Sequence, residues 1–240
     1  TAIGDLANAT NVQAQLEILE GQREQLLVTR NAELQDFSAA SGFLAQAISD
    51  VSSALQDLTD KQAVLTATAE YSISGETFSL TLEQAAAKYT DISDVAVSFA
   101  NSKEALLPAL ENAFDDASSN LVAAVAEETR LAGEENTVAN HNAYNSAVVI
   151  RGVADASFNV ASAALVAAIS AASSARIAAN TAVSVASSAI TNYNNANSAV
   201  TTANTAYNTA VATRDTAITD KSTAKADYDA AQKAVDDKNN

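Results

Sequence analysis

Few side chains in this sequence are of the types that perform acid–base, nucleophilic or metal chemistry. His141 is the only histidine and there is no cysteine, which leaves no thiolate nucleophile and no thiolate metal site. His141 stands among Asn140, Asn142 and Asn145, a context typical of an exposed loop or a helix start. No glycine-rich phosphate loop and no set of ligands at metal-binding spacing occurs. The sequence therefore predicts a protein that is not an enzyme and holds no cofactor.

Adjacent carboxylates are the pattern closest to a metal site. They occur as Asp115-Asp116, Glu127-Glu128 and Glu134-Glu135. Carboxylate oxygens are the ligands that Ca²⁺ prefers, so these pairs could collect Ca²⁺ between subunits. They match no EF-hand loop, and a solvated acidic face is the default interpretation.

The charge of the chain argues against two classes of partner. The net charge is −16 with only 13 lysine and arginine residues, whereas binding to nucleic acid or to an anionic membrane surface requires a basic face. The excess of acidic residues lies in residues 1–136, and residues 137–240 are neutral overall. We therefore expect the N-terminal half to supply solubility and the outward surface.

The composition favours long helices over a wide core. One proline and six glycines in 240 residues leave few signals that end helices or build turns. Hydrophobic residues make up 48% of the chain, mostly alanine and valine, while aromatic residues make up 5%. Because alanine buries little area but lets helices approach closely, the expected fold is thin and elongated.

Alanine recurs at every seventh position along the C-terminal part of the chain. The series is Ala147, Ala154, Ala161, Ala168, Ala175, Ala182, Ala189, Ala196, Ala203, Ala210, Ala217, Ala224 and Ala231. A second line of small or apolar residues lies three or four positions after each alanine, as in a coiled-coil stripe. A repeat of this length predicts one helix over residues 138–238, supercoiled left-handedly beside an equally long partner. We assign the alanines to a close-packed self-association seam.

Residues 6–68 are predicted to form a second long helix. Their apolar residues fall in two interleaved heptad series, namely Leu27, Leu34, Ile48 and Leu55, and Phe37, Leu44, Val51, Leu58 and Leu65. Paired series of this kind indicate the a and d positions of a coiled coil. We expect this helix to run alongside the helix over residues 138–238.

The period of the apolar residues changes to two after the first helix, which indicates a β-hairpin. The residues concerned are Ala69, Tyr71, Ile73, Phe78, Leu80 and Leu82. A type II′ turn at Gly75-Glu76 would fix the register. The cross-strand pairs would then be Ile73 with Phe78, Tyr71 with Leu80, and Ala69 with Leu82. All six side chains would share one apolar face, which we expect to lie on a helix.

The segment after the hairpin is predicted to hold shorter helices. Thr81 followed by Gln84 fits a capping box, so a helix should begin there and break near Asn101. Pro108 then opens a short helix or kinks a longer one, and residues 115–120 precede a last helix that ends near Gly133. We expect these helices and the hairpin to cap one end of the long helices.

Charge is almost missing from the middle of the C-terminal helix. Arg176 is the only charged residue between Asp155 and Arg214. A solvated helix of this length normally carries lysine and glutamate on its outer face, so burial by several neighbouring helices is favoured. Membrane insertion is disfavoured, because residues 158–175 include five serines or asparagines and Arg176 follows at once.

Two resemblances favour another class of protein. Threonine at regular spacing on an alanine-rich helix resembles the fish-type helical antifreeze proteins, although that family uses a spacing of eleven residues and this chain seven. The residues that carry this resemblance are Thr202, Thr209, Thr216 and Thr223. Long helices with a short apolar hairpin are similar to helical pore-forming toxins, in which a β-tongue enters the bilayer. These resemblances imply a secreted binding or membrane-active protein.

Together these patterns predict an all-α protein, an elongated long-helix coiled coil or helical bundle with an alanine-rich heptad seam and one small β-hairpin. The expected regions are an amphipathic helix at 1–68, an acidic region with the hairpin and short helices at 69–136, and the alanine-heptad helix at 137–240. The expected function is a structural subunit that associates with copies of itself in an extracellular or cell-surface filament, sheath or matrix. The start at Thr1 is interpreted as the mark of a removed signal peptide. The alternative function is a secreted pore-forming or ice-binding protein.

Overall fold

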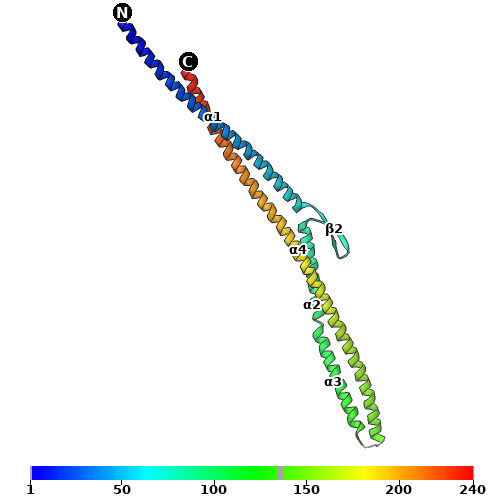
Figure 1. Cartoon of the computed structure of the whole chain (residues 1–240). Coiled ribbons are helices and arrows are strands. Elements are labelled where there is room, and N and C mark those ends of the chain that lie inside the picture. Colours follow the sequence, from blue (N-terminus) through cyan, green and yellow to red (C-terminus); the bar gives the residue numbers. More distant parts are fainter. Residues whose placement is uncertain (1, 135–137, 240) are drawn as a thin grey trace. The chain divides into compact units, whose positions relative to one another are not determined.

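The structure is a computed structural model that describes residues 2–134 and 138–239, with side chains for residues 9–134 and 138–238. Helix α1 (Ala2–Thr66) is followed by strands β1 (Ala69–Ile73) and β2 (Glu76–Leu80). Helices α2 (Leu82–Glu104), α3 (Leu107–Ala132) and α4 (Val138–Asn239) come next (Figure 1). The predicted fold class is confirmed, since the chain consists of long packed helices with one small β-hairpin.

The helices form two compact units. The first unit contains Thr1–Thr66 and Asn195–Asn240, and the second unit contains Ala67–Asn194. Helix α4 contributes its C-terminal part to the first unit and its N-terminal part to the second. In each unit, therefore, α4 packs against another part of the same chain.

In the first unit, α1 and the C-terminal part of α4 run antiparallel. The Lys238 ammonium lies 3.4 Å from the side-chain oxygen of Gln22, and the stacked rings of Phe37 and Tyr228 have centroids 6.4 Å apart. The buried or half-buried residues of α1 recur every three or four positions and include Leu26, Arg30, Glu33, Phe37, Ala40, Leu44, Ala47, Val51, Ala54 and Leu58. This spacing is the one expected of coiled-coil packing.

Only one of the two predicted heptad series in α1 faces α4. The series that begins at Phe37 is buried or half-buried. In the other series Leu27 is half-buried, whereas Leu34, Ile48 and Leu55 are 43%, 50% and 47% exposed. The prediction that both series form the contact is wrong. Small residues at the same spacing make up the second line of contact, because they let α1 approach the alanines of α4 closely: Ala40, Ala47 and Ala54.

In the second unit, α2 and α3 run antiparallel to the N-terminal part of α4 (Figure 1). The rings of Phe114 and Phe158 have centroids 5.3 Å apart, and Arg151 Nε lies 2.5 Å from Glu128 Oε2. The expectation that the short helices cap one end of the long ones is wrong. Helix α1 has 65 residues and α4 has 102, so α1 is too short to cover the whole stripe of α4, and α2 and α3 lie along the rest of it.

Helix α2 begins at the predicted capping box. The Thr81 hydroxyl accepts a hydrogen bond from the Gln84 backbone N–H, and the Gln84 side chain accepts one from the Thr81 N–H. Two of the donors left open at a helix start are satisfied in this way, which fixes the boundary between the hairpin and the helix. The helix continues past the predicted break near Asn101 and ends at Glu104.

Pro108 separates α2 from α3. It lies in the first turn of α3, where its missing N–H costs no hydrogen bond. If α2 continued without a break into α3, the Pro108 ring would clash with the carbonyl of Glu104, four residues earlier. The two helices therefore stay distinct. Helix α3 then runs unbroken through residues 115–120, where the sequence predicts an interruption, and Gly133 is its C-cap.

The hairpin forms with a different turn from the one predicted. Ser74 and Gly75 occupy the turn with φ values of 55° and 87°, the pair of positive φ values that a type I′ turn requires. The pairs are therefore Ile73 with Glu76, Tyr71 with Phe78, and Ala69 with Leu80. Each partner differs by two residues from the prediction, so the alternation of the two faces is preserved.

Leu82 does not belong to the sheet. The strand ends at Leu80, and Leu82 is the first residue of α2 because the capping box at Thr81 starts the helix there. The predicted pairing of Leu82 with Ala69 is therefore wrong.

Candidate self-association surface

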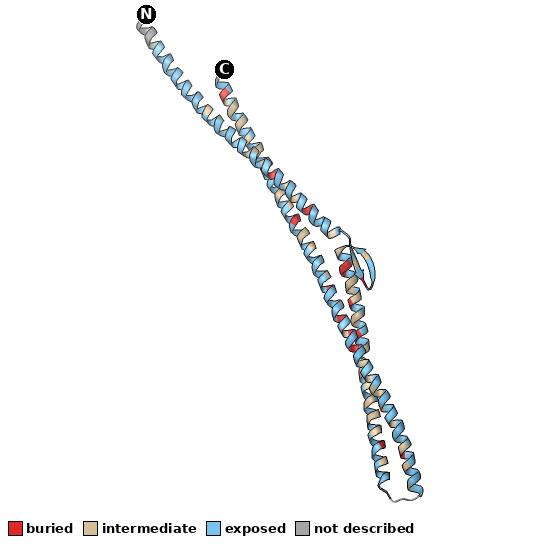
Figure 2. Cartoon of the chain, turned by 45° about the vertical axis from the view of Figure 1, so that its right-hand side comes forward, coloured by how far each residue is buried: buried red, intermediate tan, exposed pale blue. Residues whose placement is uncertain are grey.

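The predicted alanine seam lies on the packed side of α4. All thirteen members are buried or half-buried: Ala147, Ala154, Ala161, Ala168, Ala175, Ala182, Ala189, Ala196, Ala203, Ala210, Ala217, Ala224 and Ala231. Figure 2 shows that most other residues of α4 are exposed. The heptad repeat thus identifies the one stripe of α4 that the rest of the chain covers.

The chain's own helices cover this stripe. In the second unit, Ala175 and Ala179 of α4 form a buried cluster with Ala100 of α2. In the first unit, Ala217 is 0% exposed, and α1 is the only other helix there that can cover it. The close packing that alanine permits is therefore used inside one chain.

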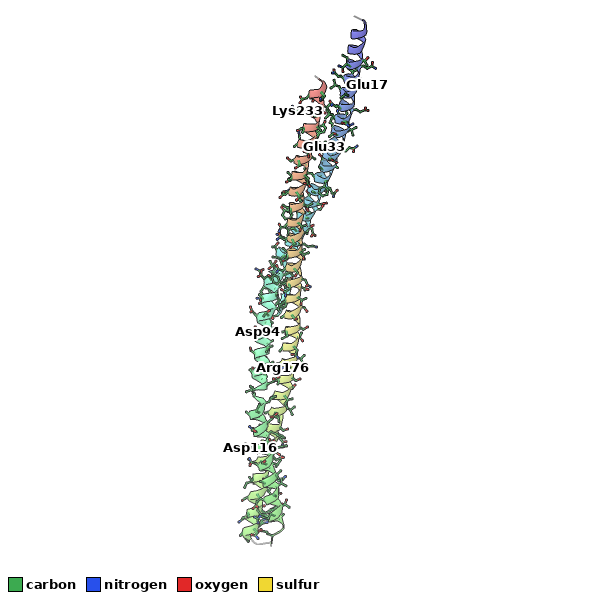
Figure 3. The ribbon with its side chains drawn as sticks, turned by 90° about the vertical axis from the view of Figure 1, so that its left-hand side faces the viewer. Glu17, Glu33, Asp94, Asp116, Arg176 and Lys233 are labelled. Carbon is green, nitrogen blue, oxygen red and sulfur yellow. The ribbon has the colours of Figure 1, made fainter. Side chains whose placement is uncertain are left out.

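Arg176, the single charge in the middle of α4, is used inside the second unit. Its Nε donates to Glu104 Oε1 at 2.7 Å, while its Nη2 donates to Glu104 Oε2 and to Asn101 Oδ1. The hydrogen bond from Arg176 lowers the pKa of the Glu104 carboxyl, although desolvation acts in the opposite direction. Arg176 is labelled in Figure 3. Apart from Arg176, whose side chain is 37% exposed within this ion pair, residues 156–213 carry no charged side chain.

The exposed side chains of residues 156–213 form what we call the uncharged surface. Seven branched apolar side chains on it are between 40% and 71% exposed: Val160, Val166, Ile169, Ile177, Val183, Val185 and Ile190. Single exposed apolar residues are ordinary, but an apolar set within a stretch that lacks charge is the composition of a contact surface.

Several of the hydroxyl groups on the uncharged surface donate to their own helix. Thr181, Ser188 and Thr191 donate to the carbonyl four residues earlier at 3.0, 3.0 and 2.9 Å. The same bond is made by Thr201, Thr205, Thr209 and Thr213. A hydroxyl whose donor is already satisfied costs less to remove from water, so these residues do not prevent burial.

Helix α4 also has the length and composition of a membrane span. Among the described helices, it alone contains an 18-residue window of mean hydropathy 1.5, of which 11% is buried. One helix of this kind is weak evidence for a span, since helices covered by other protein have the same composition.

The hairpin presents most of its apolar face to α2. Ile73 is 4% exposed, the Tyr71 ring meets the Tyr89 ring edge to face with centroids 6.3 Å apart, and Lys88 Nζ lies 4.1 Å from the centre of the Phe78 ring. Of the other predicted face residues, Leu80 and Leu82 are half-buried and Ala69 is exposed. A lone hairpin is unstable in water, so this packing on α2 accounts for the hairpin's apolar residues.

The acidic pairs are largely engaged with arginines. Arg130 forms ion pairs with both Glu127 and Glu134, and Arg151 with Glu128. The hydrogen bond from Arg130 lowers the pKa of Glu127. Glu135 lies outside the described residues. Within residues 2–134 and 138–239, no group of three or more histidine, cysteine or acidic residues is placed to hold a metal ion.

The remaining candidates lie on exposed helix faces. Asp115 and Asp116 are exposed on α3, and His141 is exposed in the first turn of α4. Of the evenly spaced threonines, Thr216 and Thr223 donate to the carbonyl four residues earlier, as Thr209 does.

The sequence contains one signal that our interpretation missed. Ala40, Ala47 and Ala54 repeat the seven-residue spacing of the α4 alanines and form the second contact line of α1. The leucines beside them obscure this line, because large apolar residues ordinarily mark a coiled-coil contact.

No protein-family model matches the chain, and no curated protein matches it significantly.

Proposed function

We propose that this chain is a structural subunit that associates with copies of itself in a filament, sheath or matrix outside the cell. The observation that carries the proposal is the uncharged surface. Between Asp155 and Arg214 the only charge, Arg176, pairs with α2, and the exposed faces hold branched apolar side chains and internally bonded hydroxyls. A surface of this composition is stable when other protein covers it.

The part of α4 that follows Arg214 supports this interpretation, because its exposed face carries charge. Lys225 pairs with Asp229 and Lys233 with Asp237, each four residues apart and exposed. Such pairs are typical of a solvated helix face. The lack of charge before Arg214 is therefore a property of one stretch and not of the whole helix.

A membrane-active protein is the second candidate. The observation in its favour is the apolar window of α4, which is 11% buried. Against it stands the net charge of −16, with only 13 lysine and arginine residues that could attract an anionic lipid surface.

Sedimentation velocity and electron microscopy of the pure protein test the proposal. We expect polymers whose amount rises steeply with protein concentration in the absence of lipid. A monomer at all concentrations that co-sediments with vesicles of phosphatidylcholine and phosphatidylglycerol would instead establish the membrane-active candidate. Cell fractionation with an antibody to the chain tests the location outside the cell, and recovery in the cytosol would contradict it.

A further inference from the structure

Helix α1 carries a third apolar line that α4 leaves uncovered. Leu34, Ile48 and Leu55 follow residues of the α4 contact line directly in sequence, and they are 43%, 50% and 47% exposed. A helix that packs against one partner needs two lines of contact residues, whereas a helix in a bundle carries a wider stripe. The stripe of α1 has the width of a bundle helix and is continuous with its contact with α4.

Charge in this part of α1 lies on the opposite side of the contact stripe. Asp36, Asp50 and Asp57 each come directly before a residue of the contact line through Phe37, while the uncovered leucines and isoleucine come directly after the other line. On a helix these two positions flank the stripe on different sides. One flank of α1 is therefore acidic and the other is apolar.

The surroundings of the apolar flank are suited to close contact. The residues on its outer edge are small or hydroxylated, namely Ser38, Ala45, Ser52 and Thr59. The Ser52 hydroxyl donates to the Ile48 carbonyl at 3.1 Å, and the Thr59 hydroxyl donates to the Leu55 carbonyl at 2.8 Å. These hydroxyls need no donor partner from water, so covering them costs little.

Helix α4 adds to the same side of the first unit. Ile218 follows the seam residue Ala217 directly and is 49% exposed, and Val211 follows Ala210 and is half-buried. Lys225, which follows Ala224 and pairs with Asp229, forms the charged edge of this side. Two antiparallel helices are related by a two-fold axis, so the positions that directly follow these contact lines lie on one side of the pair. Asp215, near this edge, is paired with Arg214.

We infer that this apolar flank is a docking face for the first unit of a second copy of the chain, which completes a four-helix bundle. The inference rests on the proposed function and names the partner and the residues. A chain of net charge −16 repels its copies, so a contact between copies needs a surface without acidic residues. The apolar flank of α1 has none over residues 34–59. A basic partner would be drawn to the acidic flank instead. Like faces that meet across a two-fold axis form a closed dimer.

Spin labelling tests the docking face. Because the chain has no cysteine, a thiol-reactive label attaches only to the one that is introduced. A nitroxide is attached to Ile48→Cys and, as the matched control, to Phe43→Cys. Phe43 is 56% exposed, similar in size, and lies on the acidic flank of the same helix. We expect dipolar broadening between labels of different copies at residue 48, which disappears when labelled chains are diluted with unlabelled ones. Residue 43 should show a mobile label without broadening.

The outcomes separate the docking face from the proposed function. Polymers without broadening at residue 48 overturn the docking face and leave the structural function in place. A soluble dimer with broadening at residue 48 but no polymer supports the face and overturns the filament. Immobilisation at residue 48 only after vesicles of phosphatidylcholine and phosphatidylglycerol are added overturns the face in favour of lipid. Circular dichroism of both variants confirms that they are folded.

Discussion

Two stretches of α4, residues 156–213 and residues 214–238, carry the same alanine stripe and different outer surfaces. In both, the seam alanines are buried or half-buried by helices of the same chain. The outer faces of the first stretch are uncharged, whereas those of the second carry Lys225–Asp229 and Lys233–Asp237 ion pairs. The stripe therefore explains how the chain folds, and the outer faces of the two stretches differ in charge. Under the proposed function, the uncharged stretch is the one whose outer faces other copies cover in the polymer.

The largest effect is expected when charge is placed on the uncharged stretch. The double substitution Ala163→Glu with Ala167→Glu puts two carboxylates on exposed positions, so it should abolish polymers while the monomer stays folded. Ala226→Glu with Ala230→Glu is the matched control, because these exposed alanines occupy the same heptad positions in the charged stretch. Sedimentation velocity measures both. Polymers that survive the first pair as well as the second would contradict the difference between the stretches.

Overpacking the stripe should affect both stretches alike. Ala179 and Ala217 are 0% exposed, so Ala179→Leu and Ala217→Leu should each lower the free energy of unfolding by about 1–3 kcal/mol. Thermal unfolding followed by circular dichroism measures the loss. Ala178→Leu, at an exposed neighbour of Ala179, should leave the melting temperature unchanged. Unchanged melting of either buried variant, with loss of polymers only, would show that the stripe packs between copies.

The smallest effect concerns the Arg176–Glu104 ion pair and its dependence on pH. Arg176 holds the pKa of Glu104 below its ordinary value of 4.5 in the folded chain, so the pair stabilises the fold above that pH. This stability is lost as the pH falls through the folded pKa. Compared with Arg176→Gln, the natural chain should therefore lose its small advantage in melting temperature below about pH 4.5. An advantage that does not decline at all as the pH falls below 4.5 would contradict the assignment.

The sequence predicts the elements of the fold well, because each depends on a local pattern. The uninterrupted alanine repeat places the last helix at residues 138–238, and the structure has Val138–Asn239. The capping box at Thr81 and the proline at the start of α3 are local signals of the same kind. Patterns of this type involve only residues that are close in sequence, so contacts with distant parts of the chain do not change the elements that they predict.

The sequence does not specify which helix covers the stripe. Alanine lines on α1 and α2 are equally able to pack on the alanines of α4, since none of them carries a distinguishing shape or charge. The sequence leaves the hairpin register open for a related reason. Gly75 supplies a positive φ in either turn type, and only the structure shows that Ser74 adopts one as well.

The uncovered apolar residues of α1 show the limit of reading burial from residue type. Leu34 and Leu55 have the spacing of contact residues, but the neighbouring alanines make the contact within the chain. Large apolar residues mark a surface that needs covering, and they do not say whether the cover belongs to the same molecule.

Thiol labelling of single cysteines before and after assembly tests the central claim most directly. The variants are Ala167→Cys and Ala230→Cys, both at exposed positions, with Ala179→Cys as the buried reference. We predict that assembly slows the reaction of a maleimide at residue 167 at least tenfold, leaves residue 230 unchanged, and that residue 179 reacts slowly in both states. Equal reactivity of residues 167 and 230 in the assembled protein would contradict the account.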